Sequence, residues 1–116
     1  MEGLGTIEKQ NTGLSAEAAV CMRRARAAFA LDRGDLAGAE RELRAAVNGF
    51  ETAGAQPIDL SIARSELAAV RLRAGDRAEA RTLLVAALPA LRAAMLPQEI
   101  SRAAAERSAG LLGLSG

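Results

Sequence analysis

The 116-residue sequence contains no histidine, tryptophan or tyrosine, and Cys21 is its single cysteine. Histidine is the most frequent general base and metal ligand, so its absence removes the usual Ser and Cys hydrolase sites and the commonest metal sites. The acidic residues suggest no paired-carboxylate site, and the glycines form no phosphate-binding loop. We therefore expect no catalytic residues, no metal and no cofactor. We expect Cys21 to be a small packed residue rather than a reactive thiol.

Long apolar runs are also missing. No stretch approaches the roughly 18 uncharged apolar residues of a membrane-spanning helix, and residues 1–5 lack the basic and apolar regions of a signal peptide. A lone cysteine excludes the internal disulfides of a secreted scaffold. The 15 basic and 14 acidic residues are interspersed and give a net charge of +1, which argues against binding to nucleic acid or to an anionic membrane. The expected protein is soluble and cytoplasmic.

The chain is instead rich in alanine, and half of its residues are hydrophobic. Alanine is the best helix former, whereas the β-branched and aromatic residues that strands prefer are scarce, with aromatics at 2%. Small side chains also allow helices to approach one another closely. The composition predicts an all-α fold built by packing helix on helix.

A repeat with a period of 41 residues runs through the chain. Gly34-Asp35 recurs as Gly75-Asp76, and leucines and alanines around this pair recur in the same register. Glycine tolerates the left-handed conformation that ends a helix, and aspartate caps the N–H groups of the next one. Each pair therefore predicts a short turn between two antiparallel, contacting helices.

Five helices are expected from these signals, over residues 15–33, 36–52, 57–74, 77–95 and 97–112. Ser15 is the expected N-cap of the first helix, and Pro57 and Pro97 are expected in the first turns of the third and fifth. Asn48-Gly49 and Leu88-Pro89 fall at equal positions in the second and fourth helices. Because proline removes a backbone donor and crowds the preceding turn, we expect a kink or local break there.

The pattern resembles the tetratricopeptide repeat. The resemblance rests on a small residue in the first helix of each unit, the Gly-Asp turn, and a small-large-small pattern in the second helix: Ala27, Ala68 and Ala109, then Ala39-Leu43-Ala46 and Ala80-Leu84-Ala87. It implies a right-handed α-solenoid of antiparallel helix pairs, with five helices in about two and a half repeats. The period of 41 exceeds the usual 34, and Ala28 and Ala69 replace the asparagine of the family's peptide-carboxylate clamp.

The expected domain organisation follows the repeat. Residues 1–14 form a mobile tail, and residues 15–116 form one helical-repeat domain with units 15–55 and 56–96 and a terminal helix over 97–113. One more period from Gly75 reaches Gly116, where the chain stops. Two interpretations remain open: the last helix is a natural cap, or the chain is a piece of a longer array.

The resemblance implies a concave face lined by the first helix of each pair. Its expected partner-binding residues are Arg24, Ala28, Leu31, Ser65, Ala69 and Leu72. Such a face receives a peptide or amphipathic helix of another protein, so we expect a non-catalytic interaction or scaffolding module, such as one in a bacterial signalling or regulatory system. The cluster Arg23, Arg24 and Arg26, joined by Arg64, either receives an acidic peptide or phosphate group or forms a solvated, paired face.

Two alternatives remain for the function. An unpartnered last helix leaves apolar surface, so the chain could be a homodimer that associates through Leu111, Leu112 and Leu114. It could also be a regulatory domain that senses a small ligand held within the superhelix.

Overall fold

The computed structural model describes residues 18–54 and 57–114, most of which are helical. A first helix is described over residues 18–32 and is followed by α2 (Leu36–Ala53), α3 (Pro57–Arg73), α4 (Arg77–Ala94) and α5 (Ile100–Leu111). The described residues include no strand, so the all-α prediction is confirmed. The expected tail over residues 1–14 and the expected cap at Ser15 lie outside the described residues.

Both Gly-Asp turns have the expected conformation. Gly34 and Gly75 adopt φ angles of 78° and 94°, in the left-handed region that favours glycine. The Asp35 carboxylate accepts a 2.8 Å hydrogen bond from the Gly38 amide, and the Asp76 carboxylate accepts one of 3.0 Å from the Glu79 amide. The two turns, 41 residues apart, therefore end one helix and begin the next in the same way.

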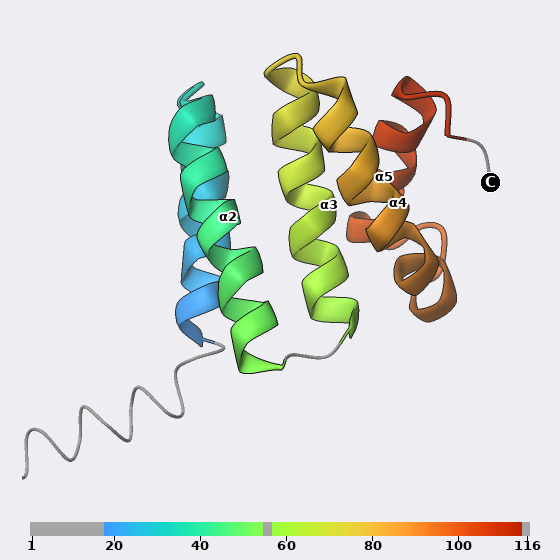
Figure 1. Cartoon of the computed structure of the whole chain (residues 1–116), viewed down its shortest axis with the longest axis horizontal. Coiled ribbons are helices and arrows are strands. Elements are labelled where there is room, and N and C mark those ends of the chain that lie inside the picture. Colours follow the sequence, from blue (N-terminus) through green and yellow to red (C-terminus); the bar gives the residue numbers. More distant parts are fainter. Residues whose placement is uncertain (1–17, 55–56, 115–116) are drawn as a thin grey trace, which may run out of the picture.

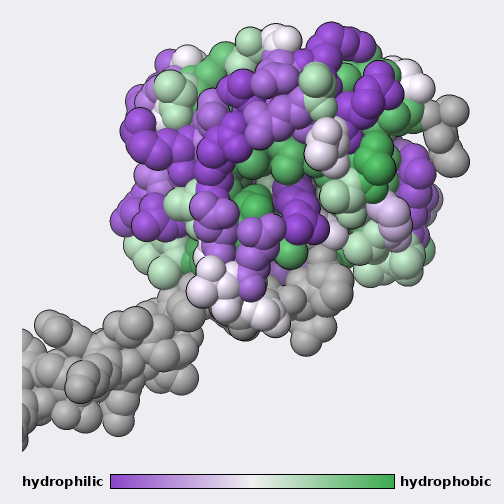
Figure 2. Space-filling view, viewed as in Figure 1, coloured by the Kyte–Doolittle hydropathy of each residue, from purple (hydrophilic) through white to green (hydrophobic). Residues whose placement is uncertain are grey.

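Consecutive helices run up and down and contact their neighbours (Figure 1). α3 packs against both α2 and α4, and α5 packs against α3 and α4, which fits a helical array. Figure 2 shows the same face of the molecule, where hydrophilic residues cover much of the surface and hydrophobic residues lie between them. None of the helices in the described ranges has the length and apolarity needed to cross a membrane.

The core consists of two adjoining clusters. The first joins the first helix, α2 and α3, and includes Leu43, Phe50 and Val70; the second joins α3, α4 and α5, and includes Leu84 and Leu91. Fully buried alanines lie between the helices in both clusters: Ala39, Ala46, Ala63, Ala68, Ala80 and Ala87. Small side chains at these positions allow the close packing that the composition predicts.

The breaks expected within α2 and α4 do not occur, because both helices continue through the irregular positions. Val85 and Pro89 are both exposed, so the Val85 carbonyl, which cannot bond to Pro89, belongs to a part of α4 that is open to solvent. Gly49 has a different role. A Cβ atom at this position would lie 2.7 Å from Cγ2 of Val20, so glycine allows the first helix to approach α2.

α5 begins three residues later than expected, at Ile100 rather than Pro97. The Glu99 carboxylate accepts a hydrogen bond of 2.6 Å from the Leu96 amide, while Glu99 itself is extended, with φ −67° and ψ 140°. The residues around Pro97 therefore form a separate turn before the helix.

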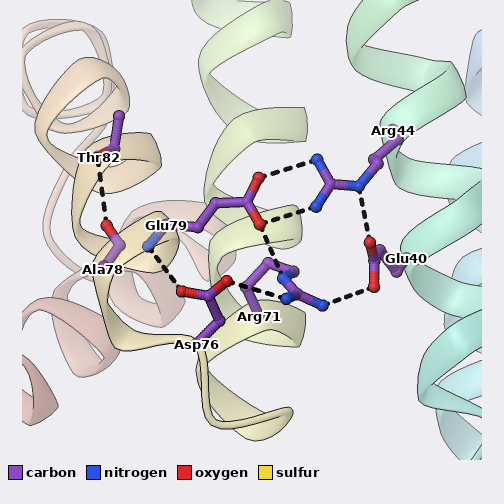
Figure 3. Close-up of polar contacts among 7 residues, drawn as sticks. All are labelled: Glu40, Arg44, Arg71, Asp76, Ala78, Glu79 and Thr82. Carbon is purple, nitrogen blue, oxygen red and sulfur yellow. Dashed lines mark hydrogen bonds and ion pairs between the residues drawn. The ribbon is translucent and has the colours of Figure 1, made fainter.

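A closed ring of four charged side chains links three helices (Figure 3). It is formed by Glu40 and Arg44 of α2, Arg71 of α3 and Glu79 of α4. The four ion pairs around the ring measure 2.6 to 2.8 Å, and Asp76 adds a fifth contact of 3.0 Å to Arg71. The Arg71 Nε atom is buried and lies 2.8 Å from Glu79 Oε1 without a well-directed hydrogen bond.

The ring changes the ionisation of its members. Hydrogen bonds from Arg44 hold the pKa of Glu79 below its ordinary value, against a smaller opposing effect of burial. The pKa of Asp76 is also lowered, first by the hydrogen bond from the Glu79 amide and then by that from Arg71. Both carboxylates are therefore ionised in the folded protein down to a lower pH than in the unfolded chain.

Candidate binding groove

Two adjoining hollows lie between α3 and α5. One has a volume of about 160 Å³ and the other about 430 Å³, and both are lined by Ala69 of α3 and Ala104 of α5. The hollows adjoin at these two alanines and are together called the α3–α5 groove here.

Helical spacing explains the floor of the groove. On α3, Ser65 and Ala69 are four residues apart, and on α5, Ser101, Ala104 and Ser108 follow at intervals of three and four. Such intervals place residues on one face of a helix. Small side chains on both facing surfaces leave space between the two helices above their point of contact.

The rim of the groove is apolar. Leu31 and Ile100 line the smaller hollow, and Leu72 and Leu111 line the larger one. Ile100 is 86% exposed and Leu111 68% exposed. These two residues lie at opposite ends of α5, so they mark the two ends of the groove.

Four of the six expected partner-binding residues line the groove: Leu31, Ser65, Ala69 and Leu72. Ala28 is exposed on the first helix and does not line it. Arg24 forms a bidentate pair with Glu66, with distances of 2.6 and 3.0 Å. This hydrogen bonding raises the pKa of Arg24, and the paired guanidinium does not provide the free basic end that the sequence predicts.

Free positive charge lies at the opposite end of the groove. Arg73 of α3 and Arg107 of α5 line the larger hollow with Leu111, and both side chains are exposed. Neither makes an ion pair or a hydrogen bond with any residue that the structure describes. Neither arginine was predicted from the sequence as a site residue; Arg73 follows the expected Leu72 directly, and Arg107 precedes Ser108 of the groove floor.

The basic cluster expected in the first helix is dispersed in the structure. Arg23 pairs with Glu42 of α2 at 3.2 Å, while Arg64 pairs with Glu51 at 3.0 Å. Arg24 pairs with Glu66 of α3, so these three arginines bind carboxylates at three different places in the fold. Cys21 is exposed, which corrects the expectation of a packed residue.

The C-terminal end of the fold is more closed than the sequence predicts. Leu112 is only 3% exposed and Leu114 packs against the second core cluster, so Leu111 is the one exposed residue of the three expected for self-association. Arg77 and Arg81 of α4 donate hydrogen bonds of 2.8 and 2.9 Å to the carbonyls of Leu111 and Leu112. These bonds satisfy acceptors at the end of α5 that have no partner within the helix.

The groove thus combines an apolar rim, a floor of small side chains and, at one end, guanidinium groups that have no partner among the described residues. Comparison with family models, curated proteins and solved structures finds no match to this chain.

Proposed function

We propose that this protein is a non-catalytic interaction module that holds a peptide or amphipathic helix of a partner protein in the α3–α5 groove. The observation that carries the proposal is the exposure of Ile100 and Leu111 at the two ends of a groove with a small-residue floor. Large apolar side chains exposed beside a hollow mark interaction sites. The helical array that supports the groove is proposed to be a right-handed, tetratricopeptide-like solenoid of about two and a half repeats.

The dimensions of the groove define the partner segment. Ile100 and Leu111 are 11 residues apart on α5, which corresponds to about 16 Å at 1.5 Å per residue. A bound helix would contact this length through about three turns, with apolar residues at helical intervals. Arg73 and Arg107 favour carboxylates on the part of the partner that lies near Leu111.

The proposal is tested by filling the groove floor. Ala69→Leu places extra side-chain volume in both hollows, whereas Ala28→Leu makes the same change at an exposed position outside the groove. With a panel of amphipathic helical peptides that carry acidic residues at one end, we expect Ala69→Leu to weaken binding at least about tenfold. Ala28→Leu should bind as the parent does, and far-UV circular dichroism should show equal helicity.

Peptides that bind both variants equally would place the binding site elsewhere on the molecule. Self-association through α5 is the second candidate function, favoured by the exposure of Ile100 and Leu111 on this one helix. Light scattering across a concentration series separates the two. A parent protein that dimerises, and a Leu111→Ser variant that does not, would support self-association.

A further inference from the structure

A further hollow, of about 300 Å³, lies at the opposite end of the fold from α5 (Figure 1). It is lined by Arg26, Phe29 and Arg33 of the first helix and its turn, and by Gly38 and Arg41 of α2. These five residues are here called the N-terminal end face. Phe29 is 67% exposed, in contrast to the buried Phe50, so the more exposed of the chain's two aromatic side chains is on this face.

The charges of this face are unbalanced. Two acidic residues also line the hollow. Glu42 pairs with Arg23, whereas Asp35 accepts a hydrogen bond from the neutral Gly38 amide and keeps its charge, so the three arginines outnumber the remaining carboxylate. The side chains of the three arginines of the face make no ion pair or hydrogen bond with any residue in the described ranges. Their guanidinium groups, arranged around an exposed aromatic ring, are therefore available to carboxylates from another molecule.

The repeat shows that the face is not adapted to receive a further helix pair. One period later, Leu67 and Val70 replace Arg26 and Phe29; both are buried in the first core cluster, which includes residues of α2. At the N-terminal end, one of these two apolar positions is an arginine. Burying that charge against another apolar helix pair would be costly, while phenylalanine still provides an apolar contact.

We propose that the N-terminal end face binds an acidic segment of a partner protein, with an apolar side chain of that segment packed on Phe29. Carboxylates on either side of this side chain pair with Arg26, Arg33 and Arg41. Arginine binds carboxylates through two parallel hydrogen bonds, and aromatic and arginine side chains contribute most of the energy at many protein interfaces. The face is separate from the α3–α5 groove, so the proposal does not depend on the function of the groove.

The test uses two fluorescein-labelled peptides, one of glutamates around a central leucine and one in which serine replaces that leucine. Fluorescence anisotropy with the full chain should show tighter binding of the leucine peptide. Arg26→Glu/Arg33→Glu should weaken its binding at least about tenfold. Phe29→Ala should weaken binding of the leucine peptide and leave that of the serine peptide unchanged. Circular dichroism and urea unfolding confirm that each variant is folded.

Arg73→Glu/Arg107→Glu is the matched control, because it makes the same change in net charge at the two unpaired arginines of the groove. It should reduce binding less than the reversal at Arg26 and Arg33. Equal losses from the two reversals, or no effect of Phe29→Ala, would show general charge attraction and overturn the proposal.

Two other occupants have their own signatures. Tighter peptide binding by Glu2→Gln/Glu8→Gln would mean that the chain's own N-terminal segment competes for the face, and would overturn the proposal of a partner. Light scattering that shows a dimeric parent and a monomeric Arg26→Glu/Arg33→Glu variant would assign the face to a second copy. A monomeric parent, together with equal peptide binding by the parent and the Glu2→Gln/Glu8→Gln variant, supports the acidic partner.

Discussion

Replacing Gly49 by alanine tests how closely the first helix approaches α2. The added Cβ atom would lie 2.7 Å from Cγ2 of Val20, whereas carbon atoms pack at about 3.5–4.0 Å, so one of the two must move. Overpacking costs about 1–3 kcal/mol, and alanine in place of glycine within a helix offsets this by about 1 kcal/mol. We expect Gly49→Ala to lower the free energy of unfolding by up to about 2 kcal/mol.

Gly110→Ala is the matched control, because Gly110 is also helical and nothing lies within 4 Å of a Cβ atom built there. This variant should gain helix propensity without a steric cost. The difference between the two variants is therefore the overpacking cost, about 1–3 kcal/mol. For a domain of this size, each kcal/mol corresponds to a Tm shift on the order of 4 °C.

Urea unfolding followed by far-UV circular dichroism measures both variants. A double variant, Gly49→Ala/Val20→Ala, should be more stable than the sum of the two single changes indicates, because removing Cγ2 of Val20 makes room for the new methyl group. Equal stabilisation by Gly49→Ala and Gly110→Ala, or additive effects in the double variant, would refute the close approach of these helices.

Three further predictions concern the helix pairs. Ala39→Leu and Ala80→Leu should each cost about 1–3 kcal/mol, because both positions are 0% exposed; unchanged urea midpoints would mean that these alanines face no partner helix. Asp35→Ala should cost about 1 kcal/mol by removing the α2 cap, and Asp35→Asn should retain most of it; equal midpoints for these two variants would count against the cap. Because the folded pKa of Glu79 is below its ordinary value of 4.5, its pairing stabilises the fold above that pH and is lost as the pH falls. The Tm of the parent should then fall more steeply than that of Glu79→Gln between about pH 5 and pH 2, and parallel curves would contradict this.

The parts of the fold that depend on neighbouring residues could be predicted from the sequence. The Gly34-Asp35 and Gly75-Asp76 turns form through glycine conformation and aspartate capping, which act within a few residues of the chain. The start of α5 was predicted incorrectly because Glu99 bonds to the Leu96 amide instead of continuing the helix from Pro97.

The candidate site was predicted only in part, because its geometry depends on how distant segments meet. The resemblance to the tetratricopeptide repeat implied Ala69 and Leu72 as groove residues, but it did not indicate which side of α5 faces α3, so Ala104 was missed. Which charged side chains form ion pairs was even harder to predict from the sequence. Arg24 and Glu66 are 42 residues apart, and nothing local to Arg24 indicates that its charge is neutralised. Arg73, which remains unpaired among the described residues, has no distinguishing feature in the sequence.

The charged ring in Figure 3 has a consequence for how this sequence can change over time. Glu40 and Glu79 each contact both Arg44 and Arg71. If one of the four is lost, the two residues that it paired with each lose one of their two ion pairs within the ring. Interactions within such a network are not additive, and a second exchange at a contacting position can restore the balance. These four positions should therefore covary among homologous sequences, with α2, α3 and α4 diverging together rather than independently.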